Sequence, residues 1–518
     1  MYFLNSNMRI ILFLCLLPSF IFSQDINTLF KEKGEIYFSF KYKNRNQLNK
    51  LSKIISLDHK IKKDSAFAYA NKKEFTEFLN LDIKYNIINH NQTYKQTKSS
   101  NWDYYPTYSE YVDMMENFAD SFPNICKLHR LGILNSGREI LIVQISNNVG
   151  TKENEPSFLY TSSMHGDELT GYVLMLRLID DILNNYSTNN YVTNLVDNID
   201  IWINPLANPD GTFAGGNNTV FGATRSNANN IDLNRNYPDP QDGLHPDGNL
   251  WQPETMIFMG LADTVNFNLA SNLHTGSVVA NYPWDTWSNI PADLNWWEHV
   301  CNEYSDTCQL NGNQNYFTDF DNGITNGFDW YEVDGGRQDY SNYFNHSREF
   351  TLELSNSKTP NPNTLPYYWN ANFSSFYNFI QQSLYGLRGI VTDSITGQPL
   401  KAFVEVINHD VDSSQIFSSL PIGNYHRYIY QGNYQIKFSK NGYHNKTINV
   451  SILNNSTSNY DIQLVPINFV GIEEKANNKN IYKFTDILGR NKNVSNKKNQ
   501  MIFRKSDDNK IKKIIILK

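Results

Sequence analysis

The sequence predicts an α/β protein whose central unit is one sheet with helices on both faces. The chain of 518 residues is longer than the roughly 250–300 residues that a single core usually reaches, so we expect more than one domain. A content of 40% hydrophobic and 14% aromatic residues is typical of packed cores and excludes a disordered chain. Between residues 102 and 384, apolar runs typical of buried strands, such as 139–145 and 199–203, alternate with helical patterns. The formal net charge of −7 gives no indication of a nucleic-acid partner.

The N-terminus has the pattern of an export signal. Arg9 precedes an apolar run, residues 10–22, and Ser23 offers a small residue for cleavage. This run is too short for a membrane span, so we expect a signal peptide at 1–23 and a mature chain without a transmembrane anchor. The alternative is a buried N-terminal helix.

Residues 24–98 form a small predicted unit of strand–helix–strand–helix–strand order, which suits an open sandwich. The strands at 36–42 and 83–88 alternate with period two, whereas Leu48, Leu51 and Ile55 follow helical spacing. The polar stretch 89–101 is predicted to be an exposed linker.

After residue 385 the chain changes to short β segments separated by turn residues, as in a small β-sandwich at 386–467. The last segment, 472–518, is rich in Asn and Lys and holds three short apolar runs. Three cysteines remain after signal cleavage. Cys301 and Cys308 are near enough in sequence for a small disulfide, while Cys126 is expected to be a buried free thiol.

Two histidines and two carboxylates stand where a metal site is expected. His165 and Glu168 follow the apolar run 158–160, and His274 ends a second apolar–polar alternation. Ligands gather outside the carboxyl ends of strands in an open α/β sheet, and imidazole with carboxylate suits zinc. Glu353 lies inside the apolar run 350–354, where a charge is costly unless it faces a site. For His274 alone, the alternative is a structural histidine.

Four further blocks carry a resemblance to a known family: Gly166-Asp-Glu168, Asp232-Leu-Asn-Arg-Asn236, Val279-Ala-Asn-Tyr-Pro283 and Gly335-Gly-Arg-Gln-Asp339. With them the sequence resembles the zinc metallocarboxypeptidases of the funnelin type, in the carboxypeptidase N/E-like branch, over about 280 residues. The resemblance implies a carboxypeptidase-like mixed twisted sheet at 99–385 and one Zn²⁺ per chain.

The resemblance also implies a role for each site residue. His165, Glu168 and His274 would bind zinc, and Glu353 would be the general base. Arg225 would stabilise the oxyanion, and the substrate's C-terminal carboxylate would be bound by Asn234, Arg235 and Tyr331. Asp285 and Gln338 would favour a basic C-terminal residue, whereas Arg337 departs from the branch and puts a second cation near that pocket. The expected activity is removal of the last residue, with a preference for Lys or Arg, from peptides or proteins that have a free C-terminus.

The flanking units resemble known companions of this family. Residues 24–98 resemble a ferredoxin-like pro-region, which would help folding and shield the site until the linker is cut. Residues 386–467 resemble a transthyretin-like domain. Residues 472–518 resemble a sorting domain of type IX secretion, and the secretion machinery would then be a partner. The alternative for 472–518 is an ordinary small β-domain. The expected location is extracellular or on the cell surface, after export through the periplasm.

Two other functions stay open: a zinc peptidase or amidase acting on cell-wall peptides, and a binding relative without catalysis. Retention of Asn234, Arg235 and Tyr331 argues against an amidase, which needs no site for a free carboxylate. Retention of every zinc ligand and of Glu353 argues against a silent relative.

Overall fold

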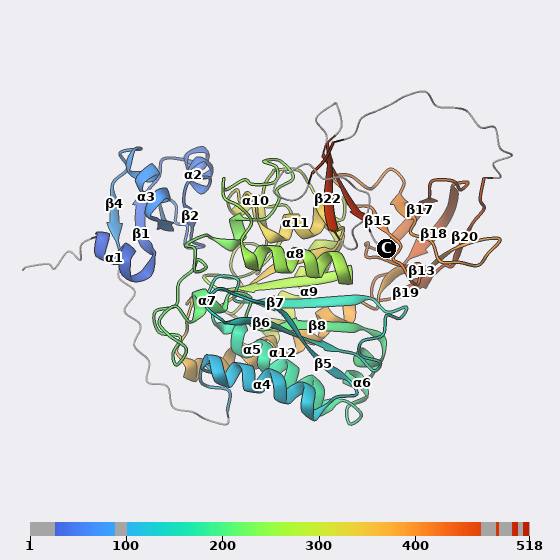
Figure 1. Ribbon diagram of the computed structural model, residues 1–518, viewed down its shortest axis with the longest axis horizontal. Coiled ribbons are helices and arrows are strands. Elements are labelled where there is room, and N and C mark those ends of the chain that lie inside the picture. The colour runs from blue at the N-terminus through green and yellow to red at the C-terminus, as the bar shows by residue number, and fades with distance from the viewer. Residues whose placement is uncertain (1–25, 89–100, 468–482, 486–499, 506–510, 517–518) are drawn as a thin grey trace, which may run out of the picture. The chain divides into compact units, whose positions relative to one another are not determined.

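A computed structural model describes residues 26–88 and 101–467, together with three strands within 483–516 (Figure 1). The predicted export signal lies outside the described residues. Among the described residues, none of the helices combines the length and the apolar composition that a membrane span requires.

The N-terminal domain is a four-stranded sheet of order β2-β3-β1-β4, and every neighbouring pair is antiparallel. After a first helix, the elements follow the β-α-β-β-α-β order of a ferredoxin-like domain, which agrees with the prediction. The sequence pattern missed α1 and the two-residue strand β2, which is too short to show a period. The elements are α1 Ile26–Lys33, β1 Glu35–Lys41, α2 Arg45–Ser52, β2 Ser56–Leu57, β3 Ser65–Asn71, α3 Lys72–Leu79 and β4 Tyr85–Ile87.

The central sheet has eight strands in the order β11-β10-β12-β9-β7-β8-β6-β5. Its four middle strands, β12, β9, β7 and β8, run parallel, while β10, β6 and β5 are antiparallel to their inner neighbours. The mixed sheet that the sequence predicted is therefore confirmed. The strands are β5 Cys126–Ile133, β6 Glu139–Ile145, β7 Ser157–Ser162, β8 Asp200–Asn204, β9 Leu269–His274, β10 Val278–Tyr282, β11 Ile324–Asn326 and β12 Arg348–Leu354.

Helices cover both faces of this sheet (Figure 1). On one face, Leu141 and Val143 of β6 share a core with α4, α5, α6, α9 and α12, whereas Ile140 and Ile142 point to the other face and pack with α8 and α11. Burial on both sides explains why the strand at 139–145 is apolar throughout. The helices are α4 Tyr108–Ser121, α5 Thr170–Asn185, α6 Asn190–Asn198, α7 Pro209–Thr212, α8 Pro253–Val265, α9 Leu294–Asn311, α10 Gly327–Trp330, α11 Arg337–Phe344 and α12 Leu365–Gln382.

The segment after α12 is a β-sandwich that begins where the sequence predicted, at Gly386. Two four-stranded sheets, β16-β13-β19 with β20 on β13 and β15-β14-β17-β18, share one apolar core. Its assignment as transthyretin-like stays a prediction. The strands are β13 Gly386–Asp393, β14 Phe403–Val406, β15 Ile416–Phe417, β16 Asn424–Arg427, β17 Gly432–Ser439, β18 Lys446–Ile452, β19 Thr457–Asn459 and β20 Ile462–Leu464.

The chain's C-terminal part forms a separate compact unit from residue 467 onward. Its described residues make a three-stranded antiparallel sheet of β21 Lys483–Thr485, β22 Gln500–Lys505 and β23 Ile511–Ile516.

The predicted disulfide between Cys301 and Cys308 is wrong. Both residues are buried on α9 and both thiols are free. Seven residues of α-helix span about 10 Å, which exceeds the Cα separation of about 7 Å that a disulfide can bridge. Cys126 is a buried free thiol, as expected.

Candidate active site

The predicted zinc ligands and the predicted base meet at the carboxyl ends of three neighbouring parallel strands. His165 and Glu168 lie in the loop between β7 and α5, and His274 is the last residue of β9. Glu353 on β12 is the direct register partner of His274. The order β12-β9-β7 therefore brings together three chain segments that are far apart in the sequence.

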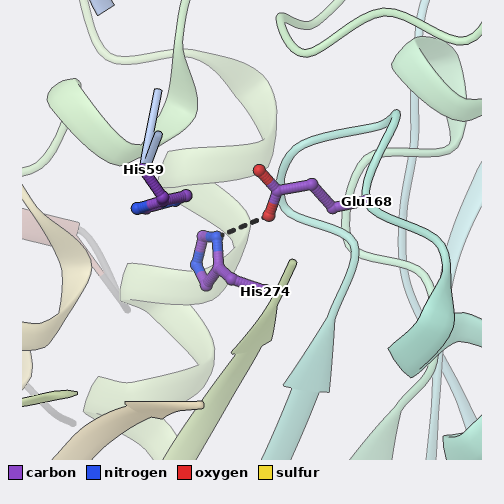
Figure 2. A group of neighbouring side chains, drawn as sticks. All are labelled: His59, Glu168 and His274. Atoms are coloured by element: carbon purple, nitrogen blue, oxygen red, sulfur yellow. Dashed lines mark hydrogen bonds and ion pairs between the residues drawn. The ribbon is translucent and has the colours of Figure 1, made fainter. Parts of the chain in front are cut away.

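The side chains of His165, Glu168 and His274 point toward one another, and each histidine does so through its Nδ1 atom. Nδ1 of His165 lies 3.0 Å from Oε1 of Glu168, and Nδ1 of His274 lies 2.9 Å from Oε2 of the same carboxylate. The two Nδ1 atoms are 3.0 Å apart. Donors around a tetrahedral zinc ion lie about 3.3 Å from one another, given zinc–ligand bonds of about 2.0–2.1 Å. The donor set therefore fits zinc closely; Figure 2 shows Glu168 and His274 facing each other in this way.

A second carboxylate orients the first histidine. Oδ1 of Asp232 lies 3.0 Å from Nε2 of His165, which holds the proton on Nε2 and makes Nδ1 an acceptor, with Nη1 of Arg225 at 3.1 Å; this lone pair is the one that would bind a metal. Lys358 also contacts Glu168, with Nζ 2.7 Å from Oε1. Burial opposes ionisation of Glu168, but the charges of His165, Lys358 and His274 outweigh it and lower the pKa of this carboxyl well below its usual value. Glu168 is thus held in the anionic form that a metal ligand needs.

Glu353 and Arg225 are buried beside this donor set. Neither carboxylate oxygen of Glu353 has a hydrogen-bond partner among the described residues, and burial, assisted by the nearby charge of Glu168, raises its pKa to about 8. Arg225 donates through Nε to Asp232 and lies 3.3 Å from Glu168 through Nη1. Its Nη2 is buried and unpaired in the described part of the chain, so one donor stays available for an oxyanion.

Arg235, Asn234 and Tyr331 form the predicted carboxylate-binding group. Arg235 donates through Nη1 to the carbonyl of Asn234, whereas its Nε and Nη2 are buried without a partner among the described residues. The amide oxygen of Asn234 accepts from the backbone N–H of Arg337, which leaves the amide N–H₂ group as a donor. Unpaired buried guanidinium groups are costly, so a bound anion is the partner that this arrangement fits.

Asp285 and Gln338 lie together next to this group. Oδ1 of Asp285 accepts from the side-chain amides of Asn281 and Gln338, both at 3.1 Å. Gly336 lies between Asp285 and Asn234. A Cβ added to it would lie 3.6 Å from Oδ2 of Asp285 and 3.8 Å from Oδ1 of Asn234, so only backbone atoms stand between these two side chains at this point. In the described chain no Lys or Arg forms an ion pair with Asp285. Burial raises the pKa of its carboxyl to about 7.

Arg337 is directed away from this pocket. Its guanidinium donates to Thr161 and, at 3.0 Å, to Oε2 of Glu349, and it lies over the ring of Phe258. The expectation that Arg337 puts a second cation near the pocket is therefore wrong, because Arg337 forms its ion pair with Glu349 on β12 and not with Asp285.

A family model described as zinc carboxypeptidase matches residues 111–375, about half of the chain. The chain belongs to the zinc carboxypeptidase family. Carboxypeptidase SOL1 of Arabidopsis thaliana is 32% identical over 373 residues, which are 70% of this chain and 72% of that protein. Carboxypeptidase D of Mus musculus is 35% identical over 385 residues, which are 71% of this chain. The chain spans only about a quarter of the length of the carboxypeptidase D relatives that it matches.

Solved structures agree on the fold. Carboxypeptidase A from Helicoverpa armigera matches with a TM-score of 0.52 and 16% identity, over 68% of this chain and 98% of that one. The thrombin activatable fibrinolysis inhibitor matches with a TM-score of 0.51 and 15% identity over the same shares. At this identity the likeness establishes a carboxypeptidase-like α/β fold and nothing about substrate.

The N-terminal domain lies against this zinc carboxypeptidase site. Glu35 accepts hydrogen bonds from the backbone N–H groups of Arg225 and Ser226, and Tyr69 donates to Asp167 beside Glu168. His59 reaches the predicted base, with Nε2 2.9 Å from Oε1 of Glu353. A cavity of about 440 Å³ lies alongside these contacts, but neither Glu353 nor the carboxylate-binding group lines it. The domain therefore covers the site.

Sequence reasoning missed four site residues. Asp232 is the first residue of the motif Asp232-Leu-Asn-Arg-Asn236, so its closeness to Asn234 and Arg235 in the sequence could have indicated that it lies at the site. Lys358 follows the strand of Glu353, a second signal that was not used. His59 and Glu35 reach the site only because a separate domain docks on it, and nothing in their local sequence indicates that.

Proposed function

We propose that the chain is a metallocarboxypeptidase that removes C-terminal Lys or Arg from peptides and proteins. One observation carries the proposal: Arg235 presents two buried, unpaired nitrogens beside the donor set of His165, Glu168 and His274. Such a group has room for one carboxylate, and a chain end is the peptide feature that supplies one.

The chain's own groups divide the reaction between them. When bound, zinc would act as a Lewis acid that polarises the scissile carbonyl and makes water more acidic. Glu353 accepts the proton of the attacking water on its carboxylate and passes it to the leaving amine. Burial raises the pKa of this carboxyl, which strengthens it as a proton acceptor. The free Nη2 of Arg225 donates to the oxygen on which negative charge develops.

The carboxylate-binding group makes the enzyme an exopeptidase. Arg235 offers two N–H donors, Asn234 an amide donor and Tyr331 a hydroxyl, so a free carboxylate is fully paired where an internal peptide bond is not. Binding of the chain end then presents the last peptide bond, and no other, to Glu353.

Asp285 supports the preference for basic residues. Its carboxylate is buried beyond Gly336, and its side-chain partners are neutral amides. An ionised group in such a place has no direct ion-pair partner among the described side chains, and a substrate lysine or arginine would provide one. Glu349 pairs with Arg337, so that cation does not compete for Asp285.

We further propose export, on the basis of the sequence pattern at 1–23, with the unit from 472 onward as a sorting signal for type IX secretion. Under this proposal the N-terminal domain is a pro-region that keeps the enzyme latent until the chain is cut between Ile88 and Asn101. For assays we define the cut chain as the protein cleaved there at an inserted protease site.

Digestion of matched peptides tests the proposal. Peptides that differ only in their last residue, Arg, Lys or Leu, are incubated with the cut chain and followed by mass spectrometry. We expect loss of one residue from the Arg and Lys peptides, slower loss from the Leu peptide, and no reaction after zinc is removed by a chelator. Internal cleavage, or activity that survives the chelator, would refute the assignment.

A further inference from the structure

His59 of the N-terminal domain is buried in the zinc carboxypeptidase site without a hydrogen bond on one ring nitrogen. Only 9% of its side chain is exposed. Its Nε2 lies 2.9 Å from Glu353, yet neither that nitrogen nor the carboxylate oxygens form an aligned hydrogen bond with a described residue. A buried imidazole with a free nitrogen indicates that a partner other than a protein group is expected there.

The arrangement around His59 is that of a metal site. His59, Glu168 and His274 each offer one ligand atom, and these atoms lie within 4.8 Å of one another (Figure 2). His165 contacts two members of this group, since its Nδ1 lies 3.0 Å from Oε1 of Glu168 and 3.0 Å from Nδ1 of His274. Glu168 and His274 are therefore shared by His165 on one hand and His59 on the other.

The surroundings of His59 hold the ring in a ligand-ready orientation. Nδ1 lies 3.4 Å from the hydroxyl of Tyr331, which can keep the proton on Nδ1 and the lone pair on Nε2. The ring packs on Trp330, with centroids 4.8 Å apart. Gly276 makes room for it, because a Cβ there would lie 2.9 Å from Cδ2 of the imidazole.

The neighbouring carboxylate fixes the backbone of this loop. Asp58 accepts from the hydroxyl of Tyr37 at 2.5 Å and from the backbone N–H of His59 at 2.9 Å. It also lies 3.7 Å from Nζ of Lys358, the lysine that contacts Glu168. The loop that carries His59 is therefore tied both to its own domain and to the catalytic domain.

We propose that in the intact chain His59 is a fourth protein ligand of the zinc ion. Catalytic zinc sites keep a position open for water or substrate, whereas four protein ligands make a closed site of the structural type. With His59 in place the open position is filled, so latency includes a change in metal coordination as well as steric cover. This inference rests on the proposed function, because it assumes that zinc binds at His165, Glu168 and His274.

X-ray absorption at the zinc edge tests the inference on the intact chain, since imidazole ligands can be counted from their scattering. Wild type is compared with His59→Ala and His59→Gln, and with Lys60→Ala, an exposed neighbour on the same loop. We expect three imidazoles in wild type and Lys60→Ala, and two in either His59 variant. Chelator competition should show that the His59 variants bind zinc at least about tenfold more weakly, since even outer partners of a ligand contribute about 10–100-fold.

Each result decides the question. Two imidazoles in wild type, with equal zinc affinity in all four proteins, would overturn the inference and leave the proposed function standing. His59 would then only cover Glu353, even if its variants were more active. A wild-type chain that binds no zinc would overturn both. Using two substitutions guards against misfolding of one, and the melting temperature of each metal-free protein identifies such a case.

Discussion

Glu353 occupies a strand position whose neighbours Leu352 and Leu354 are fully buried, and its own side chain is fully buried as well. In the proposed function this carboxylate is a base and not a ligand, so its removal should separate catalysis from metal binding. In the cut chain, we expect Glu353→Gln to lower kcat by about 10²–10⁴-fold, because the amide cannot accept the proton of water. Zinc content, measured by atomic absorption, should stay at one ion per chain. Activity within tenfold of wild type would contradict the role of Glu353.

Asp285 predicts a pH-dependent specificity. Burial raises the pKa of its carboxyl to about 7, so the group is neutral at lower pH and negative at higher pH. We expect the ratio of kcat/KM for a C-terminal Arg over a C-terminal Leu to increase as the pH rises through about 7. Titration of Glu353 affects both substrates and cancels in this ratio. The variant Asp285→Asn should give a low ratio that does not change with pH; an unchanged rise in that variant would exclude Asp285 as the cause.

The sequence motifs predicted which residues gather at the site, and the structure brings His165, Glu168, His274 and Glu353 together, because these residues lie in short blocks at strand ends. The same motifs could not reveal where Arg337 points, since that depends on Glu349, a partner on another element. They could not find His59 either, because its place in the site depends on how two domains dock.

The strand β7 and the helix α5 flank the loop that carries His165 and Glu168. They approach closely at Gly171, where an added Cβ would lie 2.2 Å from Oγ of Ser162 and 3.1 Å from Cβ of Leu273. We expect Gly171→Ala to lower the free energy of unfolding by about 1–3 kcal/mol, as overpacking does in a close-packed core. Urea denaturation followed by tryptophan fluorescence measures this change.

Gly260 on α8 is a matched control, because no atom lies within 4 Å of the Cβ that it would gain. There the same substitution should raise the free energy of unfolding by up to about 1 kcal/mol, through helix propensity alone. Equal effects at both positions would show that the contact between α5 and β7 is not tight.

The long apolar strands could be predicted from the sequence, but the order in which the strands pair in the sheet could not. The runs at 139–145 and 199–203 became β6 and β8 almost without change. The sheet order that places His274 beside Glu353 is a long-range property that no local pattern encodes. The predicted disulfide between Cys301 and Cys308 is wrong for a similar reason. A disulfide requires the two Cα atoms to lie close together in space, and the helix α9 holds them too far apart.

At the scale of the whole molecule, the N-terminal domain holds the catalytic domain through polar contacts around the site. Lys53 pairs with Asp334 at 3.0 Å, and with Glu332 and Asp242 at 3.1 Å, on the rim next to Gly335. Glu35 binds the backbone at Arg225. These contacts leave the carboxylate-binding group covered in the intact chain.

We therefore expect the intact chain to be at least about tenfold less active than the cut chain, since activity falls with the fraction of open molecules. Peptide hydrolysis before and after cutting measures this. In Lys53→Ala the intact chain should be more active than intact wild type. Equal activity of intact and cut wild type would show that the domain does not cover the site in solution.

In the proposed function, Arg235 makes this chain a carboxypeptidase because it binds a free chain end. The most direct measurement compares kcat/KM for a peptide ending in Arg with that for its C-terminal amide, in the cut chain and in its Arg235→Ala variant. For wild type we expect the free acid to be preferred by at least about 10³-fold, because a site built to pair a polar group rejects an analogue that lacks it. The variant should lose most of this preference. If wild type hydrolyses the amide as well as the acid, or if the preference survives in Arg235→Ala, Arg235 does not select a free chain end.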